Sequence, residues 1–151
     1  MGERIEYECT NCGWEYIHEN DLFMIDKNHE ISLTPLLMST FMIMEDKPVN
    51  GNYSEFYCYK CGKFVKKFII REIWDNIEGF EKEDIINDIE NYDDSPKIIE
   101  FNESDSEVFL VRDEKEICPE CGKKIKELTH DSKCPKCNSG KLQTTSILMI
   151  D

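Results

Sequence analysis

The stretch CPECGKKIKELTHDSKCPKC, residues 118–137, contains two Cys-x-x-Cys pairs separated by 12 residues. A two-residue gap lets both sulfurs of a pair reach one metal ion at about 2.3 Å when the backbone between them turns tightly. Two such pairs supply the four thiolates of a tetrahedral site. We therefore predict that Cys118, Cys121, Cys134 and Cys137 bind one zinc ion.

The other four cysteines form two more pairs, Cys9/Cys12 and Cys58/Cys61, with 45 residues between them. Loop closure costs only about 0.6 kcal/mol per doubling of loop length, so the long gap does not prevent a shared site. The simplest pairing joins neighbours along the chain and predicts a second zinc site made of Cys9, Cys12, Cys58 and Cys61. A pairing of the first Cys-x-x-Cys with the fourth is the alternative. Four thiolates also suit iron, which is the alternative metal at this N-terminal site.

Glycine follows the second cysteine in three of the four pairs, at Gly13, Gly62 and Gly122. A residue at this position often needs a positive φ, so that backbone N–H groups can point at the sulfurs, and glycine adopts it without steric cost. The glycines therefore support tight metal-binding turns.

Two segments resemble known metal-binding families. Residues 118–137 resemble the zinc ribbons of transcription and translation factors and of small adaptor proteins. The run YECTNCGWEY, residues 7–16, resembles the first metal-binding turn of rubredoxins, with an aromatic residue two positions before the first cysteine and another after the glycine. This resemblance implies a rubredoxin-like fold and, as one alternative, electron transfer through iron. The 45-residue gap, and Tyr59 where that family usually has proline, support the fold more than the redox function.

The expected fold class is α+β, small and β-rich, with two metal-stapled units of the zinc-ribbon or rubredoxin-like kind. An acidic α+β segment joins them. The predicted divisions are an N-terminal ribbon over 1–74 with a long insert at 13–57, an acidic helix and β-hairpin over 75–117, and a C-terminal ribbon over 118–151.

Patterning predicts the local elements. Residues 14–17, 22–25, 97–101, 107–111 and 141–150 are predicted strands, 80–92 a helix and 48–52 a turn. Residues 63–70 are predicted as a strand that closes the first ribbon, and a helix over 63–77 is the alternative. The apolar run 36–44 fits a helix or a buried strand, and it fits the core or an interface.

Charge is distributed unevenly along the chain, which has 18 basic and 32 acidic side chains and a formal net charge of −14. Residues 75–117 hold 4 basic and 16 acidic side chains. This acidity argues against a protein built mainly to coat nucleic acid. The last segment is locally basic, and its lysines either contact nucleic acid or a partner or offset thiolate charge: Lys123, Lys124, Lys126, Lys133 and Lys136.

Catalytic signatures are absent from the sequence. There is no Ser-His-Asp arrangement, Gly-rich phosphate loop or HExxH motif, so we expect no enzymatic activity. No secretory signal or membrane-length apolar run is visible, which favours a cytoplasmic protein with reduced thiols. The sequence thus predicts a non-catalytic zinc protein that acts as a protein-interaction adaptor, with transcription or translation as its expected setting. Nucleic-acid contact through the basic ribbon and rubredoxin-like electron transfer are the alternatives, and the oligomeric state is not predicted.

Overall fold

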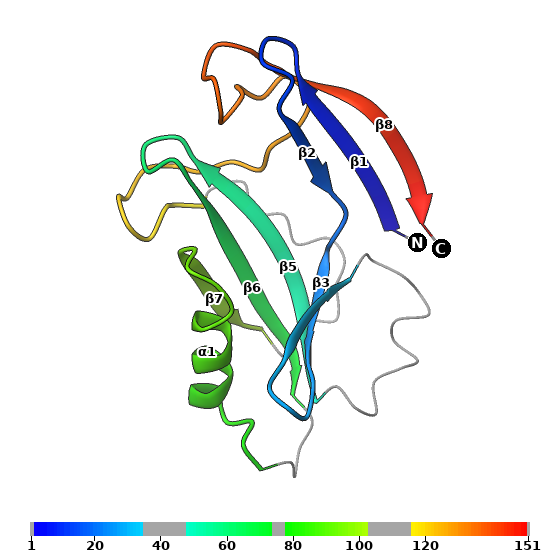
Figure 1. Ribbon diagram of the computed structural model, residues 1–151. Helices are drawn as coiled ribbons and strands as arrows, with labels where there is room; N and C mark the ends of the chain where they lie inside the picture. Colours follow the sequence, from blue (N-terminus) through cyan, green and yellow to red (C-terminus); the bar gives the residue numbers. More distant parts are fainter. Residues whose placement is uncertain (1, 35–47, 74–77, 103–115, 151) are drawn as a thin grey trace.

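The computed structural model describes residues 2–34, 48–73, 78–102 and 116–150, which form two β-sheets and one helix (Figure 1). The predicted apolar run 36–44, the predicted strand 107–111 and the end of the alternative helix over 63–77 lie outside these ranges. Within them, no helix has the length and apolar character needed to cross a membrane. The described elements, in chain order, are β1 (Gly2–Cys9), β2 (Glu15–His18), β3 (Leu22–Ile25), β4 (Ile31–Thr34), β5 (Val49–Cys58), β6 (Lys63–Ile73), α1 (Lys82–Glu90), β7 (Lys97–Phe101) and β8 (Leu142–Ile150).

The larger sheet has five strands in the order β4-β3-β5-β6-β7, antiparallel except for the parallel pair β6–β7. Its centre is the long β5–β6 hairpin. The strand predicted over 63–70 is therefore confirmed and extends to Ile73, so the helical alternative is wrong over the described part of that segment. The metal-binding turn between β5 and β6 explains this outcome, because it folds the chain back into an antiparallel pair.

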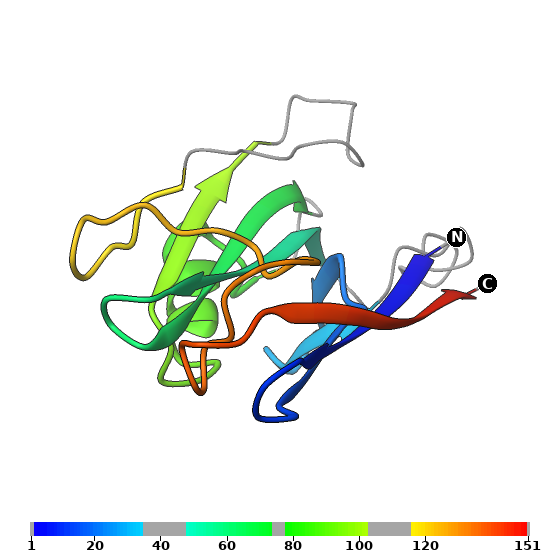
Figure 2. The same cartoon turned by 90° about the horizontal axis from the view of Figure 1, so that it is seen from above.

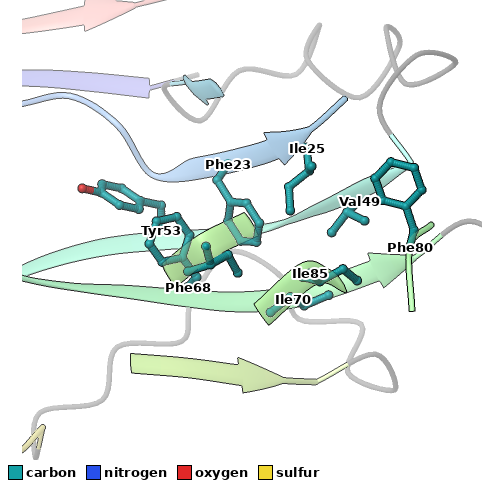
Figure 3. Packing of buried hydrophobic residues seen from close by; sticks show 9 residues of the cluster. Phe23, Ile25, Val49, Tyr53, Phe68, Ile70, Phe80 and Ile85 are labelled. Atoms are coloured by element: carbon teal, nitrogen blue, oxygen red, sulfur yellow. The ribbon is translucent and has the colours of Figure 1, made fainter. Parts of the chain in front are cut away.

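The core of this sheet lies between the strands and α1 (Figure 3). Ile85 and Ile89 are one helical turn apart on α1, and both are fully buried against the sheet. They pack with Phe23 and Phe68, whose rings meet edge to face at 5.0 Å. The helix predicted over 80–92 is thus confirmed, with shorter bounds. Because its core contains no cysteine, this part of the fold does not depend directly on metal.

The turn predicted over 48–52 is wrong, since β5 begins at Val49. A β-bulge lies between Asn50 and Gly51 where β5 pairs with β6. A Cβ atom on Gly51 would lie 1.9 Å from the Ile69 carbonyl oxygen, so glycine serves here to let two backbones approach closely. The Pro-Val-Asn-Gly-Asn composition indicated a turn, but the glycine meets a strand requirement instead.

The smaller sheet joins the two ends of the chain, with the order β2-β1-β8. All eight residues of β1 pair with β8, from Gly2 opposite Ile150 to Cys9 opposite Leu142. Figure 2 shows the N- and C-terminal strands side by side. The predicted division at residues 74 and 117 does not match this pairing, because segments assigned to separate N- and C-terminal ribbons share one sheet.

A buried and a partly exposed group of ion pairs attach the loops to the larger sheet. Lys67 on β6 has a side chain only 3% exposed, and its Nζ donates a hydrogen bond to the buried Glu116 carboxylate just before the third cysteine pair. Near β7, Asp93 accepts hydrogen bonds from Lys66 and Lys97. Burial raises the pKa of Asp93, but the two ammonium groups and Ser95 outweigh it and hold the pKa well below its usual value.

Candidate metal centres

The eight cysteines lie in two groups of four, and all are free thiols. We call the first group the Cys9 site: Cys9, Cys12, Cys134 and Cys137. We call the second the Cys58 site: Cys58, Cys61, Cys118 and Cys121. The first Cys-x-x-Cys pair thus meets the fourth and the second meets the third. The sequential pairing is wrong, and the alternative that joins the first pair to the fourth agrees with the structure.

The sulfur positions in both groups fit a tetrahedral metal ion. At the Cys9 site, Sγ atoms lie 3.6 Å apart for Cys9 and Cys137 and 3.7 Å apart for Cys12 and Cys134. At the Cys58 site the corresponding distances are 3.5 Å for Cys58 and Cys121 and 3.9 Å for Cys61 and Cys118. A tetrahedron with metal–sulfur bonds of about 2.3 Å has edges of about 3.8 Å. Both donor sets therefore fit a Zn²⁺ or Fe ion held by four thiolates.

Two long hairpins and one later segment supply these sulfurs. The β1–β2 turn carries Cys9 and Cys12, and the β5–β6 turn carries Cys58 and Cys61. Residues 116–141 then pass across both turns (yellow to orange in Figure 1). This segment forms two small turns, closed by the bridges Ile117–Lys124 and Lys133–Lys141. Each site is thus a ribbon made from one long hairpin and one small turn.

Contacts next to the sulfurs fix the pairing. At the Cys9 site, the Thr10 N–H donates to the Lys141 carbonyl at 3.0 Å, which continues the β1–β8 ladder. A Cβ atom on Gly140 would lie 2.5 Å from Cys9 Sγ, so only glycine fits this approach. At the Cys58 site, the Tyr57 N–H donates to the Lys126 carbonyl at 2.9 Å. The pairing is therefore set by strand contacts that sequence spacing does not reveal.

The predicted positive φ after each second cysteine is confirmed. Gly13, Gly62 and Gly122 have φ between 67° and 77°, and Asn138 takes the same conformation in the fourth pair with φ 58°. In every case the N–H of this residue donates to the carbonyl of the first cysteine of its pair, at 2.9–3.2 Å. Asparagine tolerates the left-handed region better than most residues, which explains why the fourth pair lacks the glycine.

The Cys9 site is surrounded by hydrogen-bond donors. The backbone N–H groups of Asn11 and Cys12 donate to Cys9 Sγ at 3.3 and 3.4 Å. On the opposite turn, Cys137 Sγ accepts from the Gly140 N–H at 3.4 Å and lies near the Ser139 hydroxyl and the Asn11 amide. Asn11 also donates to Ser139 Oγ at 2.9 Å, which ties the two turns together. Sequence reasoning missed Asn11, Ser139 and Gly140, although Asn-Ser-Gly in place of the usual glycine was the available signal.

These hydrogen-bond donors and the burial of the sulfurs give the thiols different pKa values. The Ser139 and Gly140 backbone N–H groups stabilise the Cys137 thiolate and lower its pKa to about 5. The Trp14 N–H acts in the same direction on Cys12, but burial and three neighbouring sulfurs outweigh it and raise the pKa of Cys12 to about 11. At the Cys58 site, the hydrogen bond with the Cys121 sulfur, burial and the sulfurs of Cys58 and Cys118 together raise the pKa of Cys61 to about 12. Four sulfurs at these distances thus favour a bound cation, which permits all of them to ionise together.

The five lysines predicted as contacts lie on the segment that crosses both sites, and all are exposed: Lys123, Lys124, Lys126, Lys133 and Lys136. Lys133 makes a cation–π contact with the turn of the Cys58 site, since its Nζ lies 5.1 Å from the centre of the Tyr59 ring. The Tyr59 hydroxyl donates to the Lys133 carbonyl at 2.5 Å, and this contact connects the turn of the Cys58 site to the start of the fourth cysteine pair. Their positions agree with either role, charge compensation or contact with a partner.

Comparisons with protein families, with curated proteins and with solved structures give no match to this chain.

Proposed function

We propose that this chain is a non-catalytic zinc protein, with one Zn²⁺ in each site, that acts as a protein-interaction adaptor in the cytoplasm. The observation that carries the proposal is the closure of both sites by four cysteine sulfurs at tetrahedral spacing. Structural zinc sites have four protein ligands, whereas catalytic sites keep one position for water or substrate. A filled coordination sphere leaves no position at which the metal can bind water or substrate.

The residues around each site support a stabilising role for the metal. Cys9 and Cys134 belong to a buried cluster with Tyr7, Tyr57 and Leu142. Cys58 and Cys118 belong to another, which includes Ile125. These clusters contain few large aliphatic side chains, so much of the attachment of residues 116–141 comes from the thiolates. Metal binding to such sites contributes directly to folding.

Cobalt substitution tests whether four thiolates fill the coordination sphere of the metal at each site. Co²⁺ in a four-thiolate site gives a tetrahedral absorption spectrum that small added ligands cannot alter when no coordination position is open. We expect the cobalt-loaded protein to bind two equivalents and its spectrum to stay unchanged on addition of azide or imidazole. A spectrum that changes on saturation with azide would reveal an open position and contradict the non-catalytic proposal.

The adaptor role requires its own experiment. Tagged protein loaded with zinc is compared with the same protein after removal of metal by a chelator, as bait in quantitative affinity purification. We expect a partner that binds saturably and stoichiometrically to the zinc form. Capture that does not saturate, or no specific capture by either form, contradicts the adaptor role.

Electron transfer through iron at the Cys9 site is a second candidate, and the hydrogen bonds to its sulfurs favour it. Such bonds set the reduction potential of iron–thiolate centres. Among the described residues, five hydrogen-bond donors approach the sulfurs of Cys9 and Cys137. At the Cys58 site, the same part of the chain supplies a single donor, the Cys61 N–H, which lies 3.5 Å from Cys58 Sγ.

Protein produced without added zinc distinguishes this candidate. Electron transfer predicts a coloured, reversibly reducible iron form, and Asn11→Ala should shift its potential by removing a donor. Lys60→Ala is the matched control, because Lys60 holds the equivalent position in the turn of the Cys58 site and should leave the potential unchanged. A colourless protein with two zinc ions removes this candidate.

Nucleic-acid contact through the basic segment is a third candidate, supported by the exposed lysines and by Tyr59, whose side chain could stack on a base. Substituting Lys123, Lys124 and Lys126 together should abolish binding to single-stranded oligonucleotides. Binding should also weaken steeply as salt rises. A flat salt response would contradict this role.

A further inference from the structure

The outer edge of strand β8 has no partner among the described residues over its second half. At its start the edge is occupied, because the Leu142 N–H donates to the Ser132 carbonyl and the Thr144 N–H donates to His130 Nδ1. Beyond Thr144, no backbone group of the described residues bonds to this edge. Figure 1 shows β8 at the outer side of its sheet, with β1 between it and β2. Within the described part of the chain, the outward-facing backbone N–H and C=O groups of residues 145–150 are therefore unpaired.

The side chains on this edge are apolar and exposed. Ile147, Leu148 and Met149 are 61%, 52% and 61% exposed, although they are consecutive and so project from both faces of the sheet. Ile147 pairs with Ile5, which packs against the buried cluster around Tyr7. Ile147 thus continues this apolar face onto the edge strand, while Leu148 projects from the other face.

Two of the usual protections of an edge strand, charge and proline, are missing from β8, and its β-bulge at Thr145 lies before the exposed apolar end. Natural edge strands carry charges, prolines or bulges on the exposed side, or are very short. The nine residues of β8 include no charged residue, proline or glycine, in a chain that is 33% charged. The other described edges differ: β2 and β4 have four residues each, and β7 carries Lys97 and Glu100. A strand of this kind is a template for another strand.

We propose that β8 pairs antiparallel with β8 of a second copy of this chain, related by a two-fold axis at Leu148. This register places Leu148 opposite its counterpart and Ile147 opposite Met149, so every exposed apolar side chain of the edge meets another one. The two three-stranded sheets become one sheet of six strands. The contact is isologous and closed, which makes a dimer rather than a fibre.

The uncharged edge strand permits a second copy as the partner, and the net charge of the chain sets how the contact responds to salt. Because β8 is uncharged, self-pairing puts no like charges directly opposite each other, which would destabilise a strand pair. Each copy has a formal net charge of −14, so the rest of the two chains repel. The Debye length is about 10 Å at 0.1 M ionic strength, and added salt screens this repulsion. Dimerisation should therefore strengthen with salt, opposite to the response of a basic partner or a nucleic acid.

The test is the mass of the full metal-loaded protein, measured by sedimentation velocity over a wide concentration range at low and high salt. Wild-type protein should form a dimer whose dissociation constant falls as salt rises. Leu148→Lys places two lysines at the two-fold axis and should raise the dissociation constant about tenfold or more. Ile17→Lys is the matched control, because Ile17 is 42% exposed on β2 of the same sheet and should have no effect.

Hydrogen exchange identifies the edge itself. The amides of residues 145–150 that face outward should become protected in the dimer and exchange freely in Leu148→Lys. Metal content and the far-ultraviolet spectrum confirm that each variant is folded. A monomer at every concentration overturns the proposal, as does a dimer that Leu148→Lys leaves intact or that Ile17→Lys weakens equally.

Discussion

In the nested pairing, the first Cys-x-x-Cys pair shares a site with the fourth and the second shares a site with the third. This arrangement predicts which variants still bind metal after the loss of four thiols. In the variant C9S/C12S/C134S/C137S all ligands of the Cys9 site are removed and the Cys58 site is complete. We expect this variant to retain one metal equivalent with a four-thiolate cobalt spectrum. The matched variant C9S/C12S/C58S/C61S also loses four cysteines, but it leaves two sulfurs in each site. It should bind no metal tightly.

The expected structural cost follows from the clusters around each site. Apparent binding energies of structural zinc are about 10–16 kcal/mol in zinc-finger peptides, comparable with or larger than the whole stability of a typical domain. Loss of the Cys9 site should therefore open the β2-β1-β8 sheet, whose buried cluster includes Cys9 and Cys134. The cluster between the larger sheet and α1 contains no cysteine and should persist.

Native mass spectrometry and cobalt titration measure the stoichiometry, and hydrogen exchange locates the region that opens. Amides of β5 and β6 should stay protected in C9S/C12S/C134S/C137S while those of β1 exchange. Sequential pairing makes the reverse prediction, since C9S/C12S/C58S/C61S would then keep an intact site. One metal in that variant and none in the other would refute the nested arrangement.

Three further predictions concern single side chains. Gly140→Ala places a Cβ atom 2.5 Å from Cys9 Sγ, so metal should bind more weakly at the Cys9 site and unchanged at the other, as competition with a chelator would show. Lys67→Met leaves Glu116 buried without its cation and should cost about 3–5 kcal/mol in urea denaturation, whereas combining it with Glu116→Leu should recover most of the loss. Because the pKa of Asp93 is depressed in the folded state, its ion pairs contribute fully above the unfolded pKa of about 3.9 and are lost as pH falls below it. Asp93→Asn should therefore lower stability at neutral pH, and its difference from wild type at matched pH should shrink in acid; a difference independent of pH would contradict this reasoning.

The sequence predicted the turns, strands and helix whose conformation depends on residues close by along the chain. Each Cys-x-x-Cys pair forms a tight turn because the two-residue gap and the following glycine act locally. Strands β3, β7 and β8 and helix α1 follow the apolar patterns that indicated them. Gly51 shows the limit of this reasoning, since its role depends on Ile69, which lies on the next strand. Lys67 shows it as well, because a lysine in an alternating strand is expected in solvent until its partner Glu116 is known.

The pairing of the sites shows why long-range contacts override loop length. The nested arrangement joins Cys12 to Cys134 and Cys61 to Cys118, which are 122 and 57 residues apart. Sequential sites would close gaps of 45 and 12 residues. With a logarithmic cost of loop closure, that difference favours sequential pairing by only about 2 kcal/mol. A ladder along all eight residues of β1 outweighs so small a term, because it holds the fourth cysteine pair beside the first. A cysteine spacing therefore identifies the ligands of a metal site one pair at a time, and the strand that follows the last pair decides which pairs share an ion.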